Sequence, residues 1–276
     1  MSMEAIDVTP RVWARILAAR NDEACLCCGD WSSGERAALT LYGGMTRTVS
    51  GQSVIAQIGQ SLDGRVATES GDAQDISGKD GLAHLHRLRA LADAVVIGVK
   101  TALHDNPRLT VRLAKGRNPA RVVIDPNGRL PNDAGLLRDA SARRIVIQAV
   151  DKVRPDDVEV IRLPRGEWIS PTQILAALRG VGLNHVLIEG GGITIAQFLE
   201  AGLLTRLHVA VAPLLIGAGP TGLKTSPVPC LAEALRPKTE VYGLGSDVLF
   251  DCALVPDPPA QMLWPHRVRE RPALRH

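Results

Sequence analysis

Aromatic residues, long apolar runs and excess charge are all scarce in this chain. Only 3% of its 276 residues are aromatic, so platforms that stack single-stranded nucleic acid are not expected. The formal net charge of +3 is too small to indicate a nucleic-acid surface, and the basic stretch at 266–271 is interpreted as a solvated chain end. No run reaches the ~18 apolar residues of a membrane helix, and the N-terminus lacks a signal-peptide pattern. We therefore expect a cytoplasmic protein without nucleic-acid or membrane partners.

Cysteine is also scarce, with five residues in the whole chain: Cys25, Cys27, Cys28, Cys230 and Cys252. An odd number with one tight cluster does not indicate a secreted disulfide framework. The cluster Cys25-x-Cys27-Cys28 suggests metal binding, but its spacing matches none of the common zinc pairs and no histidine follows nearby. We favour free thiols and expect no metal site.

The two ends of the chain differ in character from its middle. Residues 1–50 are of mixed composition, with a short helix expected at 12–19 and glycines that interrupt the rest. This segment is too short to bury much core alone, so we interpret it as an extension packed on the main domain, 51–255. Residues 256–276 are basic and rich in proline, a composition compatible with disorder.

Between these ends, strands alternate with helices. Short apolar runs, typical of buried strands, lie at 54–58, 94–99, 121–125, 144–148, 158–163, 185–188, 206–215 and 247–254. Helical patterns lie at 78–91, with Ser77 as the expected N-cap, at 171–179 and at 193–199. Such alternation predicts an α/β domain with a central, mostly parallel sheet flanked by helices.

The most informative motif is the run from Ile188 to Thr194, I-E-G-G-G-I-T. It follows the apolar strand at 185–188 and opens a helix. Glycines let the backbone approach a phosphate, and free N–H groups at a helix start favour an anion. Glu189 is expected at the carboxyl end of the strand, where ligands bind in α/β sheets. Taken alone, the run is equally compatible with a tight turn that binds nothing.

Four further motifs stand in a fixed order with this run. They are S-L-D-G-R-V-A at 61–67, H-R-L-R-A at 86–90, D-N-P-R-L-T-V-R at 105–112 and V-V-I-D-P at 122–126. Together with I-E-G-G-G at 188–192, they resemble the reductase domain of the bifunctional riboflavin-biosynthesis deaminase–reductase. The resemblance extends from about residue 54 to 254. It implies a dihydrofolate-reductase-like fold, a homodimer and NADPH as hydride donor.

The resemblance also implies a substrate. The family reduces the ribose of 5-amino-6-(5-phosphoribosylamino)uracil to a ribityl chain. A zinc deaminase would need H-x-E and P-C-x-x-C motifs, and residues 1–50 contain neither. We therefore expect a reductase without a deaminase domain, acting on a phosphosugar-pyrimidine.

Family positions that bind the cofactor match Gly59, Thr101, Asp105 and the stretch from Gly191 through Gly192 and Ile193 to Thr194. The resemblance places the dinucleotide pyrophosphate on the backbone N–H groups of 191–194, with the Thr194 hydroxyl adding a contact. Thr101 could instead cap a helix, and Asp105, before Asn-Pro, could be a turn residue.

Substrate-binding positions of the family match Arg89, Leu109, Arg112 and Glu189. Guanidinium groups suit a phosphate because they stay charged and bind in a bidentate manner. The alternative for Arg89 is a solvated helix face, and for Arg112 a surface ion pair. Asp105 and Glu189 are the expected catalytic carboxylates, with Asp105 donating or orienting the proton that accompanies hydride transfer.

The histidines are not required by this scheme. His84, His86, His104, His185 and His208 are expected at the surface or in packing. The apolar stretch 208–215 is interpreted as either an exposed dimer edge or a core strand.

Three residues depart from the family pattern: Gln57 replaces a lysine, Ala73 a serine, and Asp75 an aromatic residue. They leave open a reductase of the same fold with a different pterin-like or phosphosugar substrate. A non-catalytic NADPH-binding protein is the third interpretation.

Overall fold

One large sheet forms the centre of the molecule. The structure, a computed structural model, describes residues 3–48, 51–74, 76–166 and 168–255. Its strands in this part of the chain are β1 (Glu4–Ala5), β2 (Ser53–Ser61), β3 (Ala94–Gly98), β4 (Ala120–Ile124), β5 (Arg144–Gln148), β6 (Glu159–Arg162), β7 (His185–Glu189), β8 (Arg206–Ala212), β9 (Lys238–Leu244) and β10 (Asp247–Ala253). Their order across the sheet is β1-β9-β10-β8-β2-β7-β3-β4-β5-β6. All neighbours from β8 to β6 run parallel, whereas β10 runs antiparallel to β8 and β9. The predicted mostly parallel α/β sheet is confirmed.

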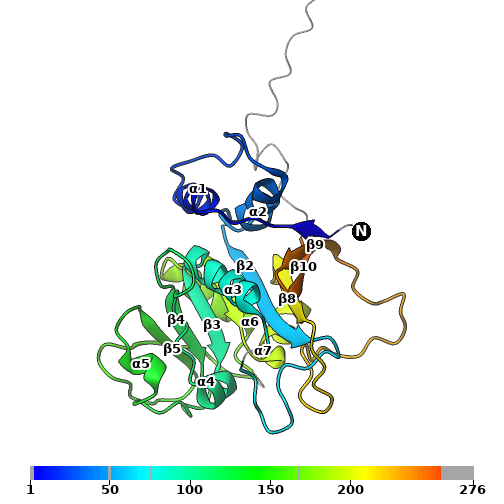
Figure 1. Cartoon of the computed structure of the whole chain (residues 1–276). Helices are drawn as coiled ribbons and strands as arrows, with labels where there is room; N and C mark the ends of the chain where they lie inside the picture. The colour runs from blue at the N-terminus through cyan, green and yellow to red at the C-terminus, as the bar shows by residue number, and fades with distance from the viewer. Residues whose placement is uncertain (1–2, 49–50, 75, 167, 256–276) are drawn as a thin grey trace, which may run out of the picture.

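Helices cover both faces of the sheet (Figure 1). They are α1 (Pro10–Arg20), α2 (Ser33–Gly43), α3 (Lys79–Leu91), α4 (Val99–Asp105), α5 (Gly135–Arg138), α6 (Pro171–Gly180) and α7 (Gly192–Glu200). Buried side chains of α1 to α5 form one apolar cluster with one face of the strands, and those of α6 and α7 form a second cluster with the other. Because both faces are covered, the central strands are continuous apolar runs rather than alternating ones.

The N-terminal segment is part of the main core. Trp13 and Ile16 of α1 and Leu39 and Tyr42 of α2 are buried in the same cluster as the central strands. Arg20 at the end of α1 forms an ion pair of 2.7 Å with Asp93. Strand β1 extends the sheet beside β9. Figure 1 shows α1 and α2 side by side at one end of the sheet, above β2.

Several sequence expectations are corrected by the structure. The N-cap of α3 is Gly78, without a side-chain cap, so Ser77 does not cap this helix. Strand β8 lies between β10 and β2, so the stretch 208–215 is not an exposed edge and ends as a strand at Ala212. Helices α2 and α4 and strand β9 were not predicted. The tail at 256–276 lies outside the described residues.

In the part of the chain that is described, no helix is long and apolar enough to cross a membrane.

Candidate active site

Two adjoining cavities open at the carboxyl ends of the central strands. The first, about 340 Å³, lies beyond β3, β4 and β7, and the second, about 520 Å³, lies beyond β2, β3 and β7. Both are lined by Val66, Lys100, Thr101, Gly191, Gly192 and Pro220, so they meet at these residues. The carboxyl edge of a parallel sheet is the usual place for a ligand in α/β proteins.

The glycine run forms the floor where the two cavities meet. Gly190 has a φ of 83°, a left-handed conformation that favours glycine, and it turns the chain from β7 into α7. At Gly192, an added Cβ would lie 1.6 Å from the backbone oxygen of Gly222, so no other residue fits there. The expected strand-to-helix turn is therefore present, and its tight packing requires glycine.

Only part of this turn is free to bind an anion. The N–H of Gly191 donates to Thr101 Oγ1 at 3.1 Å, and the N–H of Thr194 donates to the carbonyl of Gly191. Among the described residues, the N–H groups of Gly192 and Ile193 have no partner, and both residues line the first cavity. These two donors at the start of α7 are available to a phosphate.

Thr101 fixes the glycine turn rather than capping a helix. It lies within α4, whose N-cap is Gly98, so the capping alternative is wrong. Its hydroxyl accepts the hydrogen bond from Gly191, and its side chain packs on Gly190. Thr101 thus ties α4 to the β7–α7 turn at the meeting point of the two cavities.

The first cavity is strongly cationic. Four of its described lining residues carry positive charge, and none carries a carboxylate; the cations are Lys100, Arg129, Arg165 and Lys224. Arg165 also donates to the Asn127 side chain. The indole of Trp168 lines the same cavity and is 57% exposed, so one face is open to a planar ring. This cavity suits a ligand with several phosphates and an aromatic base.

The loop that carries Arg129 is held by a buried ion pair. Asp125, the aspartate of V-V-I-D-P, accepts hydrogen bonds from the backbone N–H groups of Arg129 and Leu130, both at 2.8 Å. Arg154 donates to the same carboxylate at 2.6 Å, and both side chains are fully buried. Asp125 therefore positions a cavity loop and does not face the cavity itself.

Arg89 and Glu189 meet in the second cavity. Arg89 on α3 donates to both carboxylate oxygens of Glu189 on β7, at 2.8 and 2.7 Å, and to the carbonyl of Thr110 at 3.2 Å. Both charged side chains are 8% exposed. Burial lowers the pKa of Arg89, but the charge of Glu189 outweighs this effect and raises it overall. Arg89 is thus not on a solvated helix face, and its charge is already balanced within the protein.

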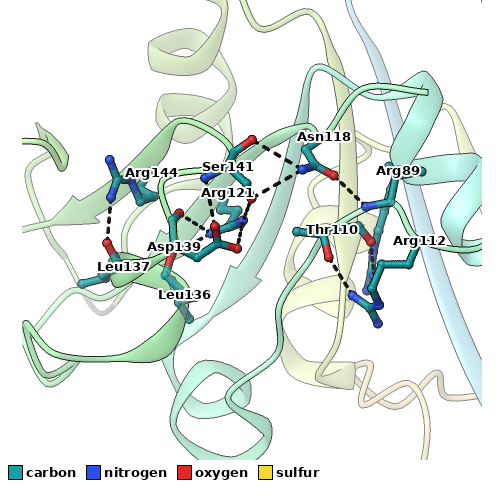
Figure 2. Close-up of polar contacts among 11 residues, drawn as sticks. Arg89, Thr110, Arg112, Asn118, Arg121, Leu136, Leu137, Asp139, Ser141 and Arg144 are labelled. Carbon is teal, nitrogen blue, oxygen red and sulfur yellow. Dashed lines mark hydrogen bonds and ion pairs between the residues drawn. The ribbon is translucent and has the colours of Figure 1, made fainter. Parts of the chain in front are cut away.

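Arg112 is more available to a ligand than Arg89. Figure 2 shows its guanidinium beside Thr110, whose hydroxyl accepts from Nη1 at 2.7 Å. It lies outside the residues that line the second cavity, and its side chain forms no ion pair among the described residues. Burial and the positive charges of Arg89 and Arg108 lower the pKa of Arg112. Arg89 is paired with Glu189, so Arg108 and Arg112 leave an excess of positive charge beside the cavity that favours an anionic group.

Hydrogen bonds of Asn118 hold the segment around Thr110 in place. The N–H of Val111 donates to Asn118 Oδ1 at 2.8 Å, and the Asn118 amide donates to Ser141. Figure 2 shows how this chain of contacts continues to the buried Arg121. Leu109, which lines the second cavity and is buried, has a φ of 53°, a left-handed backbone that this network holds in place.

Asp105 is joined to a histidine that the sequence analysis assigned to the surface. Asp105, the last residue of α4, lies 2.7 Å from His104 Nδ1, and both side chains line the second cavity. The imidazole of His104 also packs over Gly71. His104 is 60% exposed, as the surface interpretation expected, and it is in addition a candidate site residue whose role was missed. Its position next to a matched carboxylate was the available signal, since histidine beside a carboxylate can transfer protons near neutral pH.

Three further residues that the family comparison singled out also line the second cavity. They are Gly59, which matches the family, and Gln57 and Ala73, which depart from it. Gln57 is 6% exposed, and its side-chain amide forms no hydrogen bond within the described chain. It neighbours Glu189 in register across β2 and β7. The Gln57 amide is not among the fully buried groups without a partner, so it is accessible to a ligand from the cavity. Asp75 lies outside the described residues.

The other histidines among the described residues, His84, His86, His185 and His208, are buried, as expected for packing. His84 and His208 are fully buried and contact each other at 3.1 Å. His86 accepts a hydrogen bond from the Arg112 backbone N–H at 2.8 Å. Burial and the charges of Arg89 and Arg112 lower the pKa of His86 to about 4, so it is neutral near pH 7.

Fold and site together define a class, namely reductases with a dihydrofolate-reductase-like fold and a nicotinamide cofactor. Residues 52–249 match the RibD C-terminal domain family. The chain belongs to this family and is an oxidoreductase of riboflavin biosynthesis.

Individual relatives agree with this assignment. The chain is 31% identical over 210 residues to the 2,5-diamino-6-ribosylamino-4(3H)-pyrimidinone 5′-phosphate reductase of Methanothermobacter thermautotrophicus, which covers 72% of this chain and 96% of that protein. It is 32% identical over 198 residues to the riboflavin biosynthesis protein RibD of Aquifex aeolicus, covering 69% of this chain but only 54% of that protein. A solved deaminase/5-amino-6-(5-phosphoribosylamino)uracil reductase from Thermotoga maritima is 27% identical, with a TM-score of 0.65 over 74% of this chain and 57% of that one.

Proposed function

We propose that this protein reduces the ribosylamino group of a pyrimidine ribosylamine 5′-phosphate to a ribitylamino group, with NADPH as the donor. The observation that carries the proposal is the meeting of a cationic cavity and an arginine-bordered polar cavity at one glycine turn. When bound there, the reduced nicotinamide supplies a hydride to C1′ of the sugar. The C1′–O4′ bond breaks, and O4′ takes up a proton to become the 4′-hydroxyl.

The first cavity supports NADPH as the cofactor. The free N–H groups of Gly192 and Ile193 would hold the pyrophosphate, and Trp168 would stack on the adenine. Arg129 and Arg165 line the same cavity and suit the additional phosphate that distinguishes NADPH from NADH. The nicotinamide would then reach past Thr101 into the second cavity.

The second cavity supports the substrate assignment. The excess positive charge of Arg108 and Arg112 suits the 5′-phosphate, with Arg112 as the available donor. Glu189 keeps the Arg89 side chain in place, so its role is to position that arginine and to accept a hydrogen bond from the sugar or ring. Leu109 would contribute its backbone beside the phosphate.

His104 and Asp105 would deliver the proton. The contact between Asp105 Oδ1 and His104 Nδ1 orients the imidazole, whose Nε2 edge lies against Gly71 in the same cavity, so the proton would pass to the ring oxygen through a bridging water. Asp105 therefore acts as an orienting carboxylate for His104. Holding the two reactants in the correct relative position where the two cavities meet would supply much of the remaining rate acceleration.

Gln57 bears on which pyrimidine ring is accepted. A side-chain amide can donate and accept at once, which matches the N–H and C=O edge of a pyrimidinone ring. Because the relatives include reductases of a diaminopyrimidinone and of an aminouracil, both rings are substrates to be compared. A different pterin-like or phosphosugar substrate would be the interpretation if neither reacts.

We also propose a homodimer that works in the cytoplasm. Leu62 and Leu215 are 61% and 73% exposed, and the Leu62 N–H donates to Leu214, so the two side chains belong to adjacent backbone segments. Exposed leucines that lie close together favour an interface. Light scattering should report a dimer, and Leu215→Asp should convert it to a monomer, whereas Val153→Asp at an 80% exposed position should not.

The test of the activity is NADPH oxidation followed by absorbance, with each of the two pyrimidine substrates and with NADH in parallel. Turnover that prefers NADPH is expected, and Arg112→Ala should raise KM for the phosphorylated substrate by at least tenfold. Arg36→Ala is the matched control, because Arg36 is exposed and lines neither cavity. Arg165→Ala should narrow the preference for NADPH over NADH. Tight NADPH binding without turnover of either substrate would refute the proposed reaction.

A further inference from the structure

Three cysteines lie together in the loop between α1 and α2, outside the region shared with the reductase family. The Sγ atoms of Cys25, Cys27 and Cys28 all lie within 4.8 Å of one another, and those of Cys27 and Cys28 are 3.8 Å apart. None of the three forms a disulfide. Nothing in the proposed reaction uses these thiols.

The backbone of this loop is fixed by its neighbours. Leu26, between the cysteines, is buried in the core, and Trp31 is buried beside it. The Trp31 indole N–H donates to the Cys28 carbonyl at 3.2 Å. Gly29 has a φ of +126°, and an added Cβ there would lie 2.8 Å from the Trp31 ring. The chain is thus held in a shape that leaves the three sulfurs on one side.

The spacing of the sulfurs suits a thiophilic ion. A tetrahedral zinc ion with Zn–S bonds of about 2.3 Å places its sulfur ligands roughly 3.8 Å apart. The separation of Cys27 and Cys28 already equals this value, and the limit of 4.8 Å requires only small side-chain rotations for Cys25. Cys25 and Cys27 are half-buried and Cys28 is exposed, so an ion can reach the group.

The surrounding charges fit a thiolate site as well. Three thiolates with one divalent ion carry a net charge of −1. Arg15 donates to the Cys25 carbonyl at 3.5 Å, and the Arg11 guanidinium lies 4.2 Å from the Trp31 ring centre, so two cations border the loop.

We propose that Cys25, Cys27 and Cys28 form a three-thiolate site for Zn²⁺, with a fourth position open to water or an added ligand. The sequence alone favoured free thiols because C-x-C-C is not a common zinc spacing. Proximity of the three sulfurs, which spacing does not reveal, supports the opposite conclusion. The bound ion would fix the conformation of the loop that connects α1 to α2.

The experiment uses the full chain, reduced and stripped of metal with a chelator, without a histidine tag. Titration with Cd²⁺ should give a thiolate-to-metal charge-transfer band in the ultraviolet that saturates at one ion per chain. Zn²⁺ should displace it and should raise the Tm, since an ion that binds only the folded state stabilises it. Cys27→Ser/Cys28→Ser and, separately, Cys25→Ser should abolish the band.

Cys230→Ser, at an exposed cysteine outside the cluster, should leave the band and the Tm shift unchanged. Circular dichroism of each variant keeps a loss of binding distinct from a loss of folding. A band that persists in the double variant, or a stoichiometry well below one, would overturn the proposal. So would a count of three free thiols rather than five in unreduced, metal-free protein, because that result would indicate a disulfide within the cluster.

Discussion

Replacing Glu189 by glutamine should destabilise the protein strongly. The change keeps the shape of the side chain but removes the charge that balances Arg89, whose side chain is only 8% exposed. Arg89 now donates two charge-assisted hydrogen bonds to Glu189, at 2.8 and 2.7 Å. In the variant, one acceptor oxygen becomes an amide NH2 group that cannot accept from Arg89, and the other hydrogen bond becomes weaker. Breaking a buried ion pair in this way costs about 3–5 kcal/mol.

The cost is measurable by urea or thermal unfolding. For a chain of this size, each kcal/mol shifts the Tm by roughly 2–4 °C, so Glu189→Gln should lower it by about 6–20 °C. Glu23→Gln is the matched control, because Glu23 is exposed and its side chain has no hydrogen bond within the described chain. The control should shift the Tm by less than about 2 °C.

A double variant separates charge from shape. Arg89→Met with Glu189→Met removes both charges and refills the space with apolar atoms, which is often neutral for stability. We expect this protein to be more stable than Glu189→Gln alone, although it loses activity. If Glu189→Gln unfolds within about 0.5 kcal/mol of the wild type, the pair does not carry the buried charge that its geometry indicates, and the reasoning fails.

Three further predictions concern the glycine turn, pH and the N-terminal helices. Gly192→Ala would place a Cβ 1.6 Å from a backbone oxygen, so NADPH affinity measured by fluorescence should fall at least tenfold, whereas Gly180→Ala, in open space, should not change it. Burial and two nearby arginines hold the pKa of His86 at about 4, below its usual 6.5, so stability should fall as pH drops from 6.5 towards 4, and Tm-against-pH curves of His86→Asn should show a shallower fall. Tyr42→Phe leaves His84 Nδ1 without its partner and should cost about 1–2 kcal/mol in urea unfolding; no change would argue against that contact.

The elements that could be predicted are those whose signal is local. Continuous apolar runs identified β3, β4, β5 and β7 within one residue at each end, because strands buried on both faces have no polar alternation. Strand β9, K-T-E-V-Y-G-L, was missed because it alternates and is buried on only one face. Helix α2 was missed because its glycines suggested a break, although Ser32 and Glu35 form the capping box that marks its start.

The site was predicted less completely, for a physical reason. Several residues that match family motifs do line the second cavity, namely Gly59, Thr101, Leu109 and Gly191. Motif spacing could not show that Arg89 and Glu189, 100 residues apart, form an ion pair with each other. His104 was likewise missed, because only the end of α4 turns it into the cavity beside Asp105.

A chain of buried contacts connects the N-terminal helices to the site. The Tyr42 hydroxyl on α2 lies 2.9 Å from His84 Nδ1 on α3, and His84 Nε2 lies 3.1 Å from His208 Nδ1 on β8. His208 Nε2 lies 3.2 Å from Asp251 on β10, whose carboxylate also binds Arg206 at 2.8 and 2.7 Å. Burial, His208 and Arg87 lower the pKa of His84 well below its usual value, so it is neutral and has a single N–H.

That single proton constrains the whole chain of contacts. Burial raises the pKa of Tyr42 to about 12, so the phenol keeps its proton; when it donates to His84 Nδ1, the N–H of His84 is left for His208. The contacts from Tyr42 to His84 and from His84 to His208 are then each satisfied by one proton, and His208 lies beside the negative charge of Asp251. Helix α3 carries His84, in the middle of this chain of contacts, and also Leu85 and Arg89, which line the second cavity. The N-terminal helices therefore fix the position of α3, the helix that carries Arg89. We expect Tyr42→Phe, which removes the contact with His84, to raise KM for the phosphorylated substrate rather than to lower kcat.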